Sequence, residues 1–203
     1  MATNVVEAIA VLANAVQAKD QPTGLHAHRV AKAARGLGVR LGLAETDLEA
    51  LHRGGILHDV GKIVIATATL NKTGPLNRTE RTRMQAHSII GESIVAKILS
   101  DSLLLSIIRH HHERFDGCGY PDGLRGFEIP LLARIISVCD AYDALISDRA
   151  YRLRISPAAA VAVLRGGAGR QWDPDLVDVL ATQVRTGEGL GSVQIAATIA
   201  FAS

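Results

Sequence analysis

Apolar residues recur every three or four positions along most of the chain, with polar residues between them. Val5, Ile9, Leu12 and Val16 show this spacing near the N-terminus, and it is the pattern of a helix that buries one face. The same pattern predicts helices at 4–19, 25–42, 46–60, 77–85, 87–99, 102–112, 130–147, 157–165 and 174–182. We therefore expect an all-α fold, and aromatic residues, at 3% of the chain, are too few for a typical sheet protein.

Local signals mark some ends of these elements. Thr46 with Glu49, and Asn77 with Glu80, have the spacing of a capping box, in which the first side chain accepts the N3 amide and the acid reaches back. Residues 116–126, DGCGYPDGLRG, hold four glycines and a proline and are predicted to form a loop. We divide the chain into an N-terminal helix at 1–19, one helical domain at 20–182, and a tail at 183–203 whose structure the sequence does not predict.

Charge and cysteine content exclude several classes of protein. With 22 Lys and Arg against 20 Asp and Glu, the chain has no basic excess with which to bind a long nucleic acid. Cys118 and Cys139 form no CxxC pair, which favours a reducing compartment and chemistry by histidine and carboxylate. The N-terminal stretch lacks the basic start of a signal peptide, and no apolar run is long enough to span a bilayer. We therefore expect a cytoplasmic protein without a membrane segment.

His58 and Asp59 adjoin in the segment LHDVGK, and Lys62 lies one helical turn after His58. Adjacent side chains diverge on a helix, so this pair can share a metal only at a helix end or kink, and Gly61 provides one. The dipeptide alone is weak evidence, because a surface histidine beside an aspartate in the last turn of a helix has the same sequence.

A run of histidines, residues 110–113 (HHHE), joins an apolar helix to the glycine-rich loop. Histidines at this position also favour the negative end of the helix dipole, so the run alone does not identify a metal site. Asp140, Asp143 and Asp148 punctuate a predicted helix that is otherwise apolar. A carboxylate buried in such a helix needs a cation, a hydrogen-bond network or a metal.

His26 and His87 each stand near the start of a predicted helix whose following residues are apolar. Either one alone is more often a satisfied interior or surface histidine than a ligand. Together with the residues above, they supply enough nitrogen and oxygen donors for two metal ions.

The order of these residues resembles a known family. His26, then His58-Asp59, then Asp140 is similar to the pattern of the HD superfamily of metal-dependent phosphohydrolases. The segments HDVGK, His87-x-x-x-Gly91, HHERFDGCGYPDGLRG and DAYDALISDRAYR together resemble its HD-GYP subfamily, over residues from about 20 to 180. The resemblance implies an HD-type helical bundle with a glycine-rich GYP loop and makes residues 20–182 the catalytic domain.

The resemblance implies a phosphodiesterase that hydrolyses cyclic di-GMP to linear pGpG, to GMP, or to both. It assigns one metal to His26, His58, Asp59 and Asp140 and a second to His87, His111 and His112, with Asp59 bridging both, whereas His28, His52 and His110 fall outside the pattern. Two such cations would share a bridging hydroxide as the nucleophile.

Other residues are expected to contact the substrate. Lys62, which completes the expected catalytic pair with Asp59, would neutralise phosphate oxygens as charge builds in the transition state. Arg149 and Arg152 resemble the subfamily's phosphate-facing residues. The loop residues expected to grip a guanine are Gly117, Gly119, Tyr120 and Pro121. A surface lysine, helix-surface arginines and a purely structural loop are the alternatives.

The chain departs from the family pattern in places. Pro22 stands four residues before His26, where some members have a carboxylate for a third metal, so we expect two metals. Ala66, Thr67 and Cys118 replace the usual residues, which affects loop details and not the ligands. Mixed imidazole and carboxylate sites accept iron, manganese, nickel or zinc, and the resemblance favours iron or manganese. We expect Cys139 to be a buried structural thiol.

Two alternatives stay open from the sequence. The substrate could be another cyclic dinucleotide, a linear dinucleotide or a nucleotide monophosphate. The chain could instead be a non-catalytic module that senses a nucleotide. The expected partner is a cyclic dinucleotide, with no long nucleic acid and no membrane. Regulation is expected from a homodimer, from a separate regulatory protein, or from a part of a longer protein outside this sequence.

Overall fold

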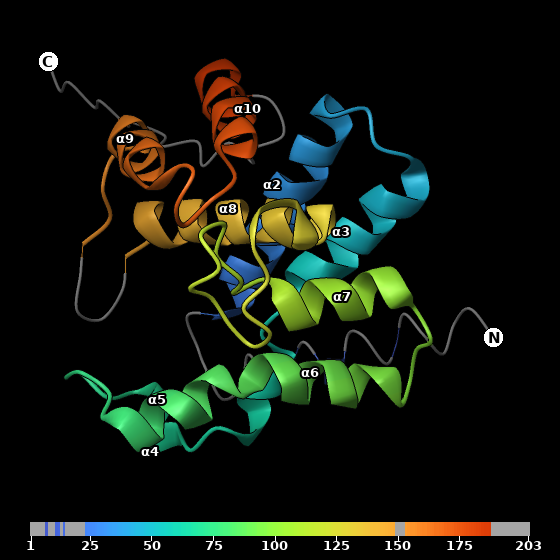
Figure 1. The fold of residues 1–203 in the computed structure, drawn as a ribbon, viewed down its shortest axis with the longest axis vertical. Helices are drawn as coiled ribbons and strands as arrows, with labels where there is room; N and C mark the ends of the chain where they lie inside the picture. Colours follow the sequence, from blue (N-terminus) through green and yellow to red (C-terminus); the bar gives the residue numbers. More distant parts are fainter. Residues whose placement is uncertain (1–6, 8–10, 13, 15–22, 149–152, 188–203) are drawn as a thin grey trace, which may run out of the picture.

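The all-α prediction is confirmed in the computed structural model, which describes residues 7, 11, 12, 14, 23–148 and 153–187 (Figure 1). The described residues contain no strand. Their elements are α2 (Thr23–Arg40), α3 (Glu45–Leu57), η1 (Val60–Val64), α4 (Thr67–Leu70), α5 (Arg78–Gln85), α6 (His87–Ala96), α7 (Ser102–His110), η2 (Gly126–Glu128), α8 (Leu131–Ile146), α9 (Pro157–Gly167) and α10 (Pro174–Thr186). Most of the helix predicted at 4–19 lies outside the described residues, and no helix within them is long and apolar enough to cross a membrane.

The predicted helix ends agree with the structure where a cap fixes them. Asn77 accepts a hydrogen bond from the amide of Glu80, whose carboxylate accepts from the amide of Asn77, so this capping box is confirmed. The box predicted at Thr46 is wrong, because α3 begins at Glu45 with Ala44 as its N-cap and without a side-chain cap. Thr46 therefore lies inside the first turn, where the carboxylates of the turn favour the helix dipole instead.

Several predicted helices are shorter in the structure, and three short elements were not predicted. The helices predicted at 46–60, 87–99 and 102–112 end at Leu57, Ala96 and His110, whereas the last helix continues to Thr186. The unpredicted elements are η1, α4 and η2, each five residues or fewer. The early ends of α3 and α7 are important for function, because the expected metal ligands follow them directly.

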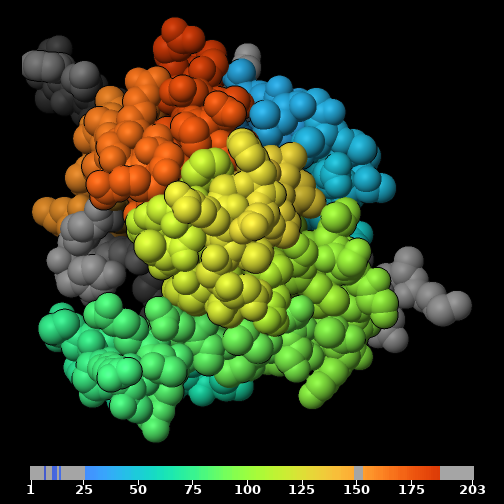
Figure 2. Space-filling model, viewed as in Figure 1, coloured from blue at the N-terminus to red at the C-terminus, as the bar shows by residue number. Residues whose placement is uncertain are grey.

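Two apolar clusters form the core on either side of these helix ends. The larger cluster joins α2 and α8 to α9 and α10, with fully buried residues such as Leu37, Ile135 and Leu180. The smaller one joins the end of α3 to η1, α6 and α7 through Leu57, Val95, Leu104 and Ile108. Figure 1 shows α8 across the middle of the molecule, with α9 and α10 on one side and α6 and α7 on the other. In Figure 2 the yellow segment that contains the glycine-rich loop and the start of α8 covers the centre of this face.

Helices α2 and α3 approach each other closely at a glycine. A Cβ atom placed on Gly55 would lie 2.4 Å from Cα and 2.6 Å from N of Ala31. These are backbone atoms and cannot move aside as a side chain can. The contact fixes the distance between α2, which carries His26, and α3, which ends just before His58.

We predict that Gly55→Ala lowers the free energy of unfolding by about 1–3 kcal/mol, because the added methyl group overpacks a backbone contact. Gly166→Ala is the matched control, since Gly166 is exposed near the end of α9 with open space around its Cβ position. The control should be unchanged or more stable by up to about 1 kcal/mol. Urea unfolding of both variants measures the difference, and equal stabilities would contradict the close contact.

Candidate metal centre

The structure brings all seven expected metal ligands together in two adjoining sets. One set is Asp59, His87, His111 and His112, and the other is His26, His58 and Asp140. Within each set the candidate ligand atoms lie within 4.8 Å of one another. The ligands come from α2, the turn after α3, the start of α6, the end of α7, and α8.

The end of α3 allows His58 and Asp59 to face the same site. The helix ends at Leu57, and Asp59 has φ −96° and ψ 8°, outside the helical conformation. Nε2 of His58 then lies 3.4 Å from Oδ2 of Asp59. The expectation that this pair needs a break in the helix is confirmed.

Because Gly61 and Gly91 have no side chains, η1 and α6 can lie in close backbone contact. A Cβ atom on Gly61 would lie 1.9 Å from the carbonyl oxygen of His87 and 2.7 Å from N of Gly91. A Cβ atom on Gly91 would lie 3.1 Å from N of Gly61. The segment HDVGK and the pattern His87-x-x-x-Gly91 are therefore the two halves of one contact, which places His87 beside Asp59.

Three buried histidines are oriented in the same way by the backbone. Nδ1 of His58 donates to the carbonyl of Gly55 at 2.9 Å, Nδ1 of His87 to that of Met84 at 2.6 Å, and Nδ1 of His111 to that of Ile108 at 2.9 Å. A carbonyl oxygen only accepts, so each Nδ1 carries a proton. Burial opposes the charge on His58, but Asp59 outweighs it and raises the pKa of that ring. Burial keeps the rings of His87 and His111 neutral, so their Nε2 atoms keep lone pairs. These lone pairs are available to a metal ion.

His26 is oriented by a carboxylate instead. Its Nδ1 lies 2.6 Å from Oδ2 of Asp143, and its Nε2 lies 3.1 Å from Oδ1 of Asp140. Arg29 donates to both oxygens of Asp143 at 2.5 and 2.9 Å and to Oγ of Ser147 at 2.9 Å. The buried carboxylate that the sequence left without a partner therefore pairs with a cation and with a ligand histidine. Its position three residues after Asp140, on the same helix face, was the available signal.

The free nitrogen atoms converge on Asp59. Nε2 of His87 lies 3.3 Å from Oδ1 of Asp59, and Nε2 of His111 lies 4.0 Å from the same oxygen. The two Nε2 atoms are 3.4 Å apart. Among the described residues, Nε2 of His58 and Oδ1 of Asp59 are buried without a hydrogen-bond partner. Lone pairs gathered in this way are costly unless a cation lies between them, so these residues fit a metal centre.

The protonation states also suit metal binding. Burial lowers the pKa of His87, places that of His111 well below its usual range, and lowers that of His112 to about 3. These three rings are therefore neutral at pH 7. Burial opposes the charge on Asp59, but Lys62 and His58 outweigh it and hold the pKa of the carboxyl well below its ordinary value.

His26 is protonated at pH 7, in contrast to the three histidines of the other set. Burial opposes the charge on His26, but hydrogen bonds to Asp140 and Asp143 outweigh it and raise its pKa to about 9. A cation bound here takes the place of that proton, since a metal ligand must be deprotonated.

The expected substrate contacts lie in different places. Nζ of Lys62 donates to Oδ2 of Asp59 at 2.6 Å, beside both ligand sets. The ring of Tyr120 packs against His112, with ring centroids 4.9 Å apart and an angle of 31° between the planes. Arg149 and Arg152 lie outside the described residues.

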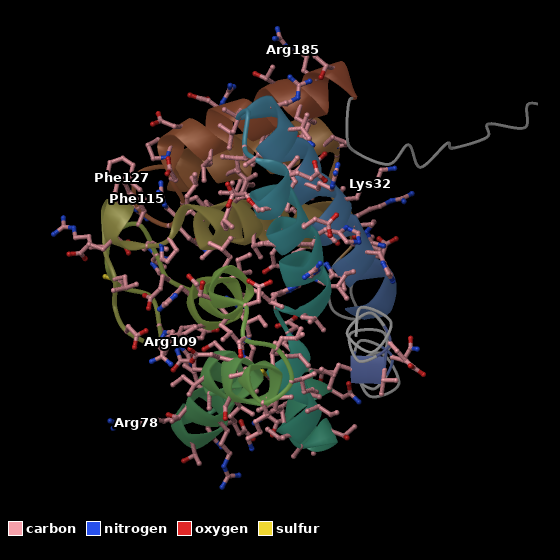
Figure 3. The ribbon with its side chains drawn as sticks, turned by 90° about the vertical axis from the view of Figure 1, so that its right-hand side faces the viewer. Lys32, Arg78, Arg109, Phe115, Phe127 and Arg185 are labelled. Atoms are coloured by element: carbon pink, nitrogen blue, oxygen red, sulfur yellow. The ribbon has the colours of Figure 1, made fainter. Side chains whose placement is uncertain are left out.

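Some residues near the centre have roles that sequence reasoning missed. Glu113 is buried and accepts hydrogen bonds from two loop amides, and His110 lies 3.0 Å from Asp122 of the loop. Asp148, by contrast, is exposed beyond α8, and Cys139 is a buried free thiol as expected. Figure 3 shows Phe115 and Phe127 side by side where the glycine-rich loop begins and ends, and their ring centroids are 5.6 Å apart.

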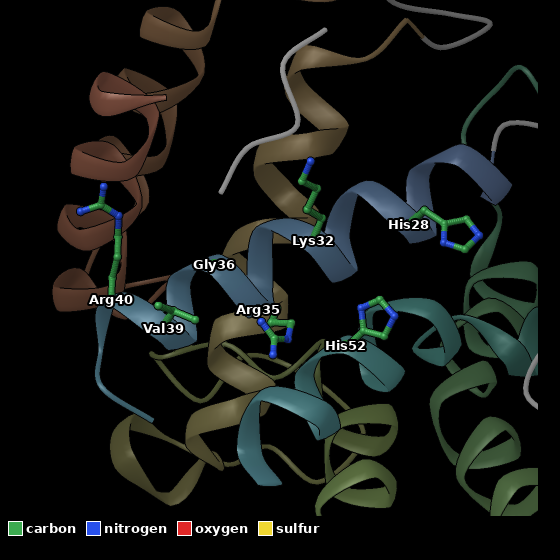
Figure 4. Close-up of a pocket in the computed structure, with 7 residues that line it drawn as sticks. All are labelled: His28, Lys32, Arg35, Gly36, Val39, Arg40 and His52. Atoms are coloured by element: carbon green, nitrogen blue, oxygen red, sulfur yellow. The ribbon is translucent and has the colours of Figure 1, made fainter. Parts of the chain in front are cut away.

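A separate groove of about 600 Å³ runs along the outer face of α2. Its lining residues are His28, Lys32, Arg35, Gly36, Val39, Arg40 and His52 (Figure 4). None of the seven candidate ligands lines it. His28 and His52, which fall outside the ligand pattern, are therefore away from the metal centre.

Comparison with known proteins agrees with the geometry. The model of the HD domain family matches residues 10–176. The chain is 38% identical over 178 residues to the cyclic di-GMP phosphodiesterase response regulator RpfG of Xanthomonas campestris pv. campestris, covering 86% of this chain and 47% of that protein. It is 36% identical over 173 residues to 3'3'-cGAMP-specific phosphodiesterase 2 of Vibrio cholerae, covering 83% of this chain and 33% of that protein. The chain thus spans about half or less of the length of these relatives.

Solved structures share the fold. The crystal structure of the cyclic GMP-AMP phosphodiesterase V-cGAP3 of V. cholerae superposes with a TM-score of 0.71 at 21% identity, over 94% of this chain and 52% of that one. The HD domain of the L. monocytogenes phosphodiesterase PgpH, in complex with cyclic-di-AMP, superposes with a TM-score of 0.65 at 18% identity, over 91% and 98%.

We predict that Gly61→Ala weakens metal binding by about 10–100-fold although it changes no ligand, because the methyl group pushes η1 away from His87. Gly74→Ala is the control, since open space surrounds its Cβ position. Titration of each purified, metal-free variant with Mn²⁺ measures the affinity. Parent-like affinity in Gly61→Ala would show that the contact does not position the ligands.

Proposed function

Because the chain belongs to the HD domain family, we propose that it is a metal-dependent phosphodiesterase that hydrolyses cyclic di-GMP to linear pGpG, to GMP, or to both. The observation that carries this proposal is the pair of adjoining ligand sets with Asp59 between them. We assign residues 20–182 to the catalytic domain. Regulation by a homodimer or by a separate protein is part of the proposal, and the greater length of the curated relatives is consistent with regulation by further domains.

We propose two divalent cations, one in each set, with iron or manganese favoured and nickel or zinc as alternatives. Bound cations supply Lewis acidity and a water of lowered pKa at neutral pH. The oxygens of Asp59 face different neighbours, since Oδ1 lies near His87 and His111, whereas Oδ2 lies near His58 and Lys62. This division supports Asp59 as the ligand common to both sets.

Lys62 is proposed to act on the phosphate. It holds a positive charge beside Asp59, at the rim of a buried site, with 22% of its side chain exposed. An ammonium in this position stabilises negative charge that grows on the non-bridging oxygens during hydrolysis. Arg149 and Arg152 are proposed to bind the same phosphates.

The glycine-rich loop is proposed to hold the nucleobases. Gly117 and Gly123 have φ of 79° and 70°, which side chains rarely adopt, so the loop needs glycine at these turns. The ring of Tyr120, which precedes Pro121, packs against the ring of His112. Gly117, Gly119, Tyr120 and Pro121 are therefore the proposed guanine contacts.

A second candidate substrate is 3'3'-cGAMP, because several similar proteins carry that name. Chromatography of products from cyclic di-GMP, 3'3'-cGAMP, pGpG and GMP, in parallel with the purified holoenzyme, tests both. Linear pGpG or GMP from cyclic di-GMP at the highest rate supports the proposal. Faster cleavage of 3'3'-cGAMP or of a mononucleotide contradicts it, and tight binding without turnover would indicate a sensing module.

Two variants separate metal binding from transition-state stabilisation. Asp59→Ala should lose metal and activity together, because it removes the carboxylate shared by the two sets. Lys62→Ala should keep both metals and lower kcat by about 10²–10³-fold. Lys97→Ala, at an exposed position after α6, is the control for a lost lysine. Elemental analysis and kinetics measure these effects, and full metal content in Asp59→Ala would contradict its shared role.

A further inference from the structure

The glycine-rich loop (residues 116–126) is fastened to the protein by a buried carboxylate. Glu113 is 3% exposed, and its Oε1 accepts hydrogen bonds from the amides of Asp122 at 2.7 Å and Gly123 at 3.1 Å. Burying a carboxylate costs free energy unless hydrogen bonds satisfy it. At this site both hydrogen bonds come from backbone amides of the loop to Oε1, and among the described residues Oε2 is buried without a hydrogen-bond partner.

A second attachment lies outside the first and is more exposed. Arg109 donates to both carboxylate oxygens of Asp122 at 2.7 and 2.8 Å and to Glu92 at 2.6 Å. Nε2 of His110 lies 3.0 Å from Asp122. Solvent screens these exposed pairs, so they contribute less than the buried bonds of Glu113. Asp122 is therefore held by its side chain, through Arg109 and His110, and by its amide, through Glu113.

The glycine-rich loop packs directly against the candidate ligand His112. A Cβ atom on Gly119 would lie 2.3 Å from N of Arg114 and 2.5 Å from Cα of Glu113, so the loop touches the backbone there. The amide of Tyr120 donates to the carbonyl of His112 at 3.3 Å, and its ring packs on the His112 ring. The position of Tyr120 therefore depends on where the loop is held.

We propose that Glu113 is a positioning residue that holds the loop so that Tyr120 and Pro121 present a fixed surface to the substrate. This inference rests on the proposed function and deepens it, since it assigns a role in substrate binding to a residue that does not touch the substrate. Loss of the carboxylate frees the loop, and the substrate must then order it on binding. The expected effect is therefore on KM, with little effect on kcat.

Three variants test this role. Glu113→Met keeps the approximate volume and apolar burial but removes the acceptor, Glu113→Ala also leaves a cavity, and Glu113→Gln keeps an oxygen that accepts both amides. Glu128→Ala is the matched control, because Glu128 accepts a hydrogen bond from the amide of Arg125 at 2.9 Å in the same way but is exposed. Glu113→Met keeps the test informative if the alanine variant fails to fold.

The first measurement is site-resolved amide hydrogen exchange, which needs no substrate. In Glu113→Met the amides of Asp122 and Gly123 should exchange at least about tenfold faster than in the parent, and Glu113→Gln should restore most of the protection. The second measurement is steady-state kinetics with metal analysis, where Glu113→Met should raise KM about tenfold, with kcat within about threefold and the metal content unchanged.

The outcomes separate the two proposals. Unchanged exchange in Glu113→Met overturns the positioning role, and so does lost metal, or a lowered kcat with KM unchanged. If the parent hydrolyses no cyclic dinucleotide, the proposed function fails, while the exchange measurements still decide whether Glu113 holds the loop.

Discussion

The structure depends on a buried carboxylate, Asp59, surrounded by the imidazole rings of three histidines. Asp59 is 6% exposed, and the Nε2 atoms of His58, His87 and His111 all point toward it. The Nδ1 atom of each ring donates to a carbonyl group. Burial keeps the rings of His87 and His111 neutral, whereas Asp59 outweighs burial and raises the pKa of His58. Lys62 already donates to Oδ2 of Asp59, whereas Oδ1 is buried without a hydrogen-bond partner. A cation bound among these atoms would satisfy Oδ1 and the histidine nitrogens together.

This constraint explains where helices end. Both α3 and α7 end immediately before ligands, since adjacent residues of a continuing helix would point apart. Close glycine contacts then replace side-chain packing, at Gly55 against α2 and at Gly61 against α6. Contacts between backbones define distances more narrowly than flexible side chains do, which suits a site whose ligands come from five separate places.

The sequence predicts the helices and the candidate ligand residues, but not which distant side chains pair with each other in the folded chain. Helical periodicity and the capping box at Asn77 are local, so they can be found in the chain itself. The candidate ligands were chosen because histidines and carboxylates in apolar surroundings require partners, and because their order resembles a family. The pairing of Asp143 with Arg29 joins residues 114 positions apart, and no local pattern encodes it. The cap predicted at Thr46 failed because the helix starts one residue earlier, a difference that spacing alone does not resolve.

The run at 110–113 shows why a motif of consecutive residues can combine several roles. Because α7 ends at His110, the next side chains leave the helix in different directions. His110 contacts Asp122 of the loop, His111 faces Asp59, His112 lies beneath Tyr120, and Glu113 accepts the loop amides. One turn of the chain therefore connects the metal centre to the loop. A shift of this turn would displace ligands and loop together, so the part of the chain that supplies the chemistry also fixes the surface proposed to bind the substrate.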